Sequence, residues 1–302
     1  PLIATRKHME AIGKYDSFKD FNENGLAYFI DYLRTKCKMG ENTIQKHFAN
    51  LRWFLNWAIR KGYCTEEAIK RYKPKFRIID KPVIFLNKDE LIRLYKYEIP
   101  ENGTKVKLVD LNGEEYEKEV KDAGALAKTR DLFCFCAFTS LRYSDMAKLK
   151  RTDIVGDYIY VTTQKTNDRL PIDLNEYSKA ILNKYKDVKF PYDLALPVIS
   201  NQKMNDYIKE LGELCGFNEP ITRVSFRAGQ KVTEIQPKWE LLGTHAARRT
   251  FICTMLSMGV SPQIVMKWTG HSDYKAMKPY IDIAESAKAE AMNVFSKGLE
   301  NL

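Results

Sequence analysis

The sequence predicts a mainly α-helical protein with small antiparallel β-sheets, an α+β fold, divided into two domains. Three observations predict this class. Apolar residues recur at helical spacing over most of the 302 residues, short alternating runs flank glycine-containing turns, and positive charge is concentrated in the first part of the chain. The content of 44% hydrophobic and 12% aromatic residues supports packed cores rather than disorder.

The charge distribution suggests where the domains divide. Residues 1–86 hold 17 Lys and Arg against 9 Asp and Glu, whereas the remainder holds 32 against 30. We therefore expect an N-terminal helical domain at residues 1–80, a linker at 81–86 and a second domain at 87–302. A basic domain beside a nearly neutral one indicates contact with nucleic-acid phosphates, the alternative being a charged surface that is merely solvated.

The first domain is predicted to contain three helices. Residues 1–15 resemble a helix tail or linker with little core of their own. One helix follows Phe18 and is broken at Gly40, a second runs from Thr43 to Arg60, and a third follows Thr65 as its N-cap. The apolar residues that form the stripe of the first helix are Leu26, Phe29, Ile30 and Leu33.

Two tryptophans on the second helix, Trp53 and Trp57, lie one turn apart. We assign them to core or inter-helix packing, which needs no ligand. The basic, proline-interrupted stretch after the third helix has the character of an interdomain linker.

The second domain is predicted to begin with Asn87 as an N-cap and Glu90 completing a capping box. Alternating runs around Asn112-Gly113 predict a β-hairpin at 104–120, which we regard as an insertion of unknown role. The remaining predicted elements are a helix at Thr129–Phe138, strands at Ile154, Tyr158–Thr163 and Arg169–Ile172, helices at Asn175–Lys186 and Asn201–Cys215, a hairpin at Ile221–Ile235 turning at Gly229, and a C-terminal helix at 284–298.

Several classes of protein are disfavoured. No apolar run approaches twenty residues and no signal-peptide pattern is present, so we expect a soluble protein of the cytoplasm. The start at Pro1 suggests a processed or truncated chain. The six cysteines lack metal-ligand spacing, and Cys134 and Cys136 are expected to be buried reduced thiols. We expect neither a metal nor a cofactor.

Chemistry-bearing residues are concentrated near the C-terminus. His245 and Arg248 lie three apart at the start of a predicted helix with Thr244 as N-cap, where the helix dipole favours an anion. Ser261-Pro262 starts a further helix that Gly270 ends, and His271 and Tyr280 follow. Arginine, histidine and tyrosine without a nearby carboxylate or cysteine cluster fit a phosphate diester. Taken singly, each motif is more often a surface or capping feature.

The order and spacing of His245-x-x-Arg248, Gly270-His271 and Tyr280 resemble the C-terminal signature of the tyrosine recombinases, or phage-type integrases. The resemblance extends upstream from these residues to about Asn87. It includes Arg142 in a turn after an apolar helix, Asp145 three residues later, and Lys165 between two strand-like runs. The basic helical domain resembles those of integrases from bacterial mobile elements, such as conjugative or mobilisable transposons.

The resemblance implies a site-specific recombinase that cleaves and rejoins DNA strands through a 3′-phosphotyrosine on Tyr280. Arg142 and Arg248 would contact the scissile phosphate, and Lys165 would protonate the departing 5′-oxygen. His245 would exchange the phenol proton, His271 would donate a hydrogen bond to the phosphate, and Asp145 would hold Arg142 or His245. Tyr274 is the nearest rival nucleophile. No metal is required.

The expected partner is double-stranded DNA, held in a clamp between a SAM-like core-binding domain and the catalytic domain. The resemblance also implies a homo-oligomer, a tetramer on synapsed DNA joined through helix 284–298, with DNA-bending accessory proteins and a location at the bacterial nucleoid. Candidate phosphate-contacting residues are Lys46, Arg52, Lys70, Arg71, Lys73, Lys75 and Arg77. The alternatives are a type IB topoisomerase and a non-catalytic DNA-binding regulator with the same fold.

Overall fold

The computed structural model describes residues 2–162, 169–227 and 229–285. The chain divides by its contacts into two units, one formed by residues 1–82 with 222–235 and the other by 83–221 with 236–302. Helices dominate both units and the sheets are small and antiparallel, so the predicted fold class is confirmed. Among the described residues, no helix is both long and apolar enough to cross a bilayer.

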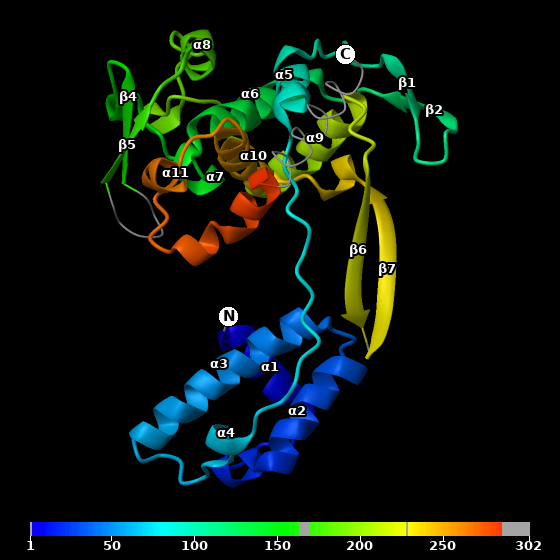
Figure 1. Ribbon diagram of the computed structural model, residues 1–302, viewed down its shortest axis with the longest axis vertical. Coiled ribbons are helices and arrows are strands. Elements are labelled where there is room, and N and C mark those ends of the chain that lie inside the picture. Colours follow the sequence, from blue (N-terminus) through cyan, green and yellow to red (C-terminus); the bar gives the residue numbers. More distant parts are fainter. Residues whose placement is uncertain (1, 163–168, 228, 286–302) are drawn as a thin grey trace, which may run out of the picture. The chain divides into compact units, whose positions relative to one another are not determined.

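The first unit is built on two long helices, α2 (Glu23–Thr35) and α3 (Glu41–Arg60), drawn in blue in Figure 1. The predicted stripe of α2 is fully packed, with Leu26, Phe29 and Leu33 at 0% exposure against the apolar face of α3. Around them lie the helix α1 (Leu2–Ile12), the 3₁₀ turn η1 (Phe18–Phe21) and the short helix α4 (Ala68–Arg71).

Residues 2–12 form a helix, one of the two alternatives expected for residues 1–15, and it packs on α3, where the buried hydroxyl of Thr5 lies 2.9 Å from Nδ1 of His47. Two expectations for this unit need correction. Trp53 is 55% exposed, so it is a surface residue rather than a core residue. The helix α4 begins later than predicted because the Glu66 side chain, not Thr65, accepts a hydrogen bond from the first amide, that of Ala68.

The hairpin of β6 (Pro220–Arg227) and β7 (Gln230–Pro237) is confirmed, and its turn contains Gly229 at a φ of +79°. Its distal residues, 222–235, belong to the first unit. There Arg227 forms a β-bridge with Gly40, the N-cap of α3. The Arg77 guanidinium donates to the Gly229 carbonyl at 3.1 Å and lies 5.2 Å from the Phe226 ring centroid.

The second unit surrounds α6 (Ala123–Thr139), whose residues 131–139 are all buried. A helix that is apolar on every side requires neighbours all round, and α6 packs against α5 (Lys88–Lys96), α8 (Glu176–Lys184), α9 (Asn201–Leu214) and α10 (Thr244–Ser257). The capping box predicted at the start of α5 is present, between Asn87 and Glu90.

Two further sheets belong to this unit (Figure 1). The predicted hairpin at 104–120 is confirmed as β1 (Lys105–Val109) and β2 (Glu115–Glu119). The three predicted strands are also confirmed, as an antiparallel sheet of β3 (Ile154–Val155), β4 (Tyr158–Thr162) and β5 (Arg169–Asp173). The remaining short elements are η2 (Arg151–Asp153), η3 (Pro191–Asp193) and η4 (Lys238–Leu241).

Candidate active site

Arg248 lies on α10 and is buried, with 4% exposure, the same value as Asp145. Its guanidinium donates one hydrogen bond to the Ser140 carbonyl at 2.9 Å and another to the Thr269 carbonyl. The planar guanidinium of Arg248 is therefore held in place by two main-chain carbonyl groups that are distant from it in the sequence.

The end of α6 determines where Arg142 lies. Ser140 ends that helix in the left-handed conformation, at a φ of 62°, and turns the chain so that Arg142 becomes the N-cap of the short helix α7 (Tyr143–Met146). The Arg142 side chain forms an ion pair with the buried carboxylate of Asp145 at 3.7 Å. This ion pair holds the guanidinium of Arg142 near the helix start.

The helix α11 (Pro262–Thr269) begins after Ser261 and ends at Gly270, whose φ is 61°, as predicted. This ending places His271 next to the last turn, where its Nδ1 atom lies 2.7 Å from the Thr269 hydroxyl. The neighbouring Trp268 donates from Nε1 to the Asp173 carboxylate on β5 at 2.9 Å. Thr269 thus contacts both His271 and Arg248.

Tyr280 lies in a helical segment, residues 278–285, that follows the 3₁₀ turn η5 (Tyr274–Ala276). It packs, partly buried, against an apolar cluster that includes Ile252 and Leu256 of α10. The rival Tyr274 is 53% exposed and is not part of that cluster.

Electrostatics connect these side chains. Burial, together with the positive charge of Arg142, lowers the pKa of the Arg248 guanidinium to about 10, whereas the carboxylate of Asp145 and the phenolate form of Tyr280 oppose this decrease. The four groups are therefore close enough for their charges to interact. Two arginines held near each other in a partly desolvated place favour an anion with several oxygens, such as a phosphate.

The predicted residues at the start of α10 do not share the burial of Arg248. His245 is the second residue of α10 and is exposed, although it shares this helix with the buried Arg248. The N-cap of α10 is Gly243 rather than Thr244, because Asn205 of α9 accepts the hydrogen bond from the Thr244 amide at 2.9 Å. Lys165 lies outside the described residues, as does most of the predicted helix 284–298.

The candidate DNA-contacting residues separate into two groups. Lys46, Arg52 and Lys73 line one open hollow beside α3, together with the exposed Trp53. The others lie elsewhere on the surface of the same unit, and three of them already have protein partners. Lys70 pairs with Glu67, Arg71 pairs with Glu23, Arg77 binds the hairpin, and Lys75 is exposed.

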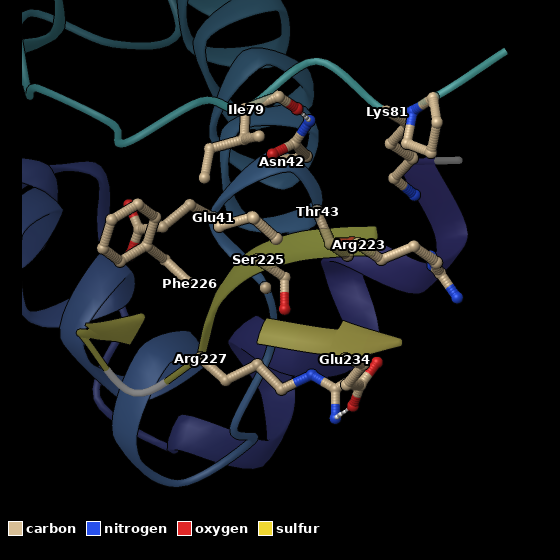
Figure 2. A pocket seen from close by; sticks show the side chains of 13 residues that line it. Glu41, Asn42, Thr43, Ile79, Lys81, Arg223, Ser225, Phe226, Arg227 and Glu234 are labelled. Carbon is tan, nitrogen blue, oxygen red and sulfur yellow. Dashed lines mark hydrogen bonds and ion pairs between the residues drawn. The ribbon is translucent and has the colours of Figure 1, made fainter. Parts of the chain in front are cut away.

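A second hollow in the first unit lies where the hairpin meets the start of α3 (Figure 2). Asn42 donates to the Ile79 carbonyl at 3.2 Å on one wall, and Arg227 pairs with Glu234 at 3.6 Å on another. Its basic residues also include Lys81 and Arg223. The hairpin thus adds positive charge to the first unit.

Two residues that contact Arg248, Ser140 and Thr269, are not recognisable from the sequence. Their main-chain carbonyls accept hydrogen bonds from a side chain that is distant in sequence, and a carbonyl carries no residue-type pattern. The described ranges contain no group of three His, Cys, Asp or Glu side chains able to hold a metal ion. Cys134 and Cys136 are buried free thiols, as predicted.

Comparison with known proteins finds phage integrases and a tyrosine recombinase. Residues 113–287 match the phage integrase family and residues 3–78 match the phage integrase SAM-like domain. A tyrosine recombinase of Thermosipho africanus is 24% identical over 294 residues, covering 95% of this chain and 88% of the relative.

Several solved structures share the fold, among them two integrases bound to DNA. One is a lambda integrase (75–356) dimer bound to a COC′ core site, with a TM-score of 0.62 and 16% identity, covering 93% of this chain and 88% of that chain. The other is the Tn1549 transposon integrase in complex with circular intermediate DNA, with a TM-score of 0.57 and 13% identity, covering 88% and 84%.

The fold is that of enzymes that recombine DNA. Because the match to the family spans more than half of the sequence, this chain belongs to the phage integrase family and is a tyrosine recombinase, a site-specific enzyme that breaks and rejoins DNA strands.

Proposed function

We propose that this tyrosine recombinase integrates or excises a mobile genetic element, with Tyr280 as the nucleophile. The observation that carries the proposal is the buried Arg248, which lies within electrostatic range of Arg142, Asp145 and Tyr280. Two guanidinium groups bind the non-bridging oxygens of the scissile phosphate and stabilise the charge that grows there in the transition state.

The reaction proceeds in two transfers at phosphorus. The Tyr280 oxygen attacks, the bond to the 5′-oxygen breaks, and a 3′-phosphotyrosine forms. His245 takes the phenol proton, Lys165 protonates the departing 5′-oxygen, and His271 contacts a phosphate oxygen. A 5′-hydroxyl from the partner strand then attacks the phosphotyrosine and releases Tyr280. Since the energy of the broken phosphodiester bond is retained in the phosphotyrosine ester, rejoining needs no nucleotide cofactor.

In this proposal residues 1–80 form the core-binding domain, 81–86 the linker and 87–302 the catalytic domain. The DNA backbone runs along the hollow beside α3, where Lys46, Arg52 and Lys73 gather. Gln45 and Asn56, which line the same hollow, present amide groups suited to base edges. The remaining candidate DNA contacts are Lys70, Arg71, Lys75 and Arg77.

The active assembly in this proposal is a tetramer on two synapsed DNA duplexes, joined through the segment 284–298, with accessory DNA-bending proteins. Support comes from a lambda integrase tetramer bound to a Holliday junction, which shares the fold with a TM-score of 0.59. The transposon integrase among the matched structures supports a mobile element as the substrate. The enzyme would act on the nucleoid, in the cytoplasm.

A nicked duplex that carries the joined ends of the encoding element tests the proposal, because cleavage near the nick traps the covalent intermediate. Wild-type protein should give an adduct that survives a denaturing gel and maps to Tyr280, whereas Tyr280→Phe should give none. Tyr274→Phe is the matched control and should retain the adduct. Binding without any adduct would favour a non-catalytic regulator. Relaxation of supercoiled DNA without exchange between two sites would favour a topoisomerase.

A further inference from the structure

Thr269 is a fully buried polar residue at the end of α11, with 0% exposure. Its hydroxyl lies 2.8 Å from the Val265 carbonyl oxygen and 2.7 Å from Nδ1 of His271, and a third, longer contact of 3.4 Å leads to the Met266 carbonyl. Its own carbonyl accepts a hydrogen bond from Arg248. Thr269 therefore contacts both Arg248 and His271, the two side chains on α10 and after α11 that the proposed function places at the scissile phosphate.

The number of available protons decides how the two short contacts are made. A hydroxyl carries one proton, and a carbonyl carries none. If Thr269 donated to His271, its oxygen would face the Val265 carbonyl oxygen at 2.8 Å with no proton between them, which is repulsive. If Thr269 instead donates to Val265, the imidazole must supply the proton for the second contact. Only this second arrangement places one proton in each short contact.

We propose that Thr269 is a positioning residue that holds His271 in the tautomer with its proton on Nδ1. The Nε2 atom is then the nitrogen that gains and loses a proton. The tautomer itself follows from the contacts above, whereas its catalytic consequence rests on the proposed function of His271.

The consequence concerns what His271 can do at the phosphate. With Nδ1–H committed to Thr269, the neutral ring offers only an acceptor at Nε2. It therefore accepts a proton at that atom, and it donates a hydrogen bond to a phosphate oxygen only after it becomes an imidazolium. Thr269 thereby determines that Nε2 is the atom of His271 that accepts a proton. Through its main-chain carbonyl, Thr269 also orients Arg248.

Nitrogen NMR measures the tautomer directly. The chain holds only four histidines, so ¹⁵N-histidine labelling gives a simple spectrum, and His271→Gln assigns the signals. In the full-length protein, at a pH where the ring is neutral, Nδ1 of His271 should appear as the protonated nitrogen. Thr269→Val should shift the ring towards the Nε2–H form, and Thr269→Ser should preserve the wild-type form. A wild-type spectrum with the proton on Nε2 overturns the proposal.

Cleavage of the nicked duplex measures the catalytic consequence. Thr269→Val should slow adduct formation by about tenfold or more, up to a limit set by the roughly 10² to 10⁴ that a positioned acid–base group typically supplies, and Thr269→Ser should restore it. The main-chain bond to Arg248 is the same in both variants. Unchanged cleavage by Thr269→Val, despite an altered tautomer, would overturn the positioning role.

A matched control exists on α6. The buried hydroxyl of Thr139 donates to the Phe135 carbonyl at 2.7 Å, the same bond to the fourth preceding residue that Thr269 makes to Val265. Thr139→Val should leave the His271 signals and cleavage unchanged, and altered His271 signals in this variant would assign the effect to packing. If wild-type protein shows the expected tautomer but forms no adduct, the proposed function fails while the tautomer assignment stands.

Discussion

The guanidinium of Arg248 donates a 2.9 Å hydrogen bond to the carbonyl oxygen of Ser140, a residue in the left-handed conformation at the end of α6. The Ser140 hydroxyl in turn donates to the Trp268 carbonyl on α11 at 3.0 Å. Ser140 therefore connects α10 and α11, and it also sets the turn that leads to Arg142. Its backbone conformation should matter more than its side chain.

Substitution of Ser140 tests this connection. Ser140→Gly keeps the positive φ without strain, whereas Ser140→Val places a β-branched residue in a conformation that such residues avoid. We expect Ser140→Val to lower the free energy of unfolding by about 1–3 kcal/mol relative to Ser140→Gly. Chemical denaturation measures this difference. DNA cleavage should fall more in Ser140→Val than in Ser140→Gly, and equal cleavage by both would show that the turn does not align the arginines.

The proximity of Arg142 and Arg248 predicts stabilisation by oxyanions. Burial and the charge of Arg142 lower the pKa of Arg248 to about 10, so at neutral pH Arg248 stays charged but its charge costs free energy in the folded protein relative to the unfolded chain. A sulfate ion bound between the guanidinium groups relieves this cost and should raise the melting temperature more than chloride of equal ionic strength. In Arg142→Gln most of this difference should disappear. An equal response of both proteins would place the sulfate elsewhere.

The sign of the pH dependence follows from the same pKa. A cationic group whose folded pKa lies below its unfolded value makes the protein relatively more stable as pH rises above the folded pKa. Arg248 therefore opposes folding fully below about pH 10, and this effect declines as the pH rises from there towards the ordinary pKa of arginine. We expect the stabilising effect of Arg248→Met, measured by denaturation, to be largest near neutral pH and to shrink above pH 10.

The fold was largely predictable because its helices and hairpins have local signals. The stripe of α2 and the Asn87 capping box depend on residues three or four apart, and both were located correctly. The sequence predicts Thr244 as the N-cap of α10, whereas the Thr244 amide is itself bound by the side chain of Asn205. Asn205 is distant in sequence, so no local pattern reveals this contact. Trp53 was assigned to the core because helical spacing does not reveal which face has a neighbour.

The candidate site was predictable to a lesser degree. Residue types and order led to Arg142, Arg248 and Tyr280, since their chemistry fits a phosphate. Ser140 and Thr269 could not be found in the same way, because their main-chain carbonyls accept hydrogen bonds from Arg248 on α10, which is distant from both in sequence. Supporting contacts of this kind depend on tertiary packing.

The hollow beside α3 predicts a particular salt dependence of DNA binding. Each lysine that contacts a phosphate contributes about 0.9 to the slope of log affinity against log salt concentration. Lys46→Ala should weaken binding and make this slope shallower by about that amount. The control is Lys36→Ala, an exposed lysine of the same unit that does not line the hollow. Equal slopes for the two variants would remove Lys46 from the DNA interface.

The ion pair of Arg34 and Glu41 predicts a pH-dependent stability of the first unit. Arg34 donates two hydrogen bonds to the buried Glu41 carboxylate, at 2.7 and 3.1 Å, and these lower the pKa of Glu41. The stabilisation is therefore present above the unfolded carboxyl pKa and is lost as pH falls through the folded value. Arg34→Met should cost on the order of 3 kcal/mol at pH 7. In a Glu41→Gln background the same change should cost much less.

The contact between the hairpin and Arg77 within the first unit predicts a local change in hydrogen exchange. Arg77 binds the Gly229 carbonyl and lies over the Phe226 ring, so Phe226→Ala removes one of the two contacts of Arg77 with the hairpin. A loss of about 1 kcal/mol should speed amide exchange in residues 222–235 roughly fivefold, as measured by mass spectrometry. Ile235→Ala, a change at a residue that is 63% exposed, is the control and should have little effect. Equal exchange in the two variants would mean that the Arg77 contact does not hold the hairpin.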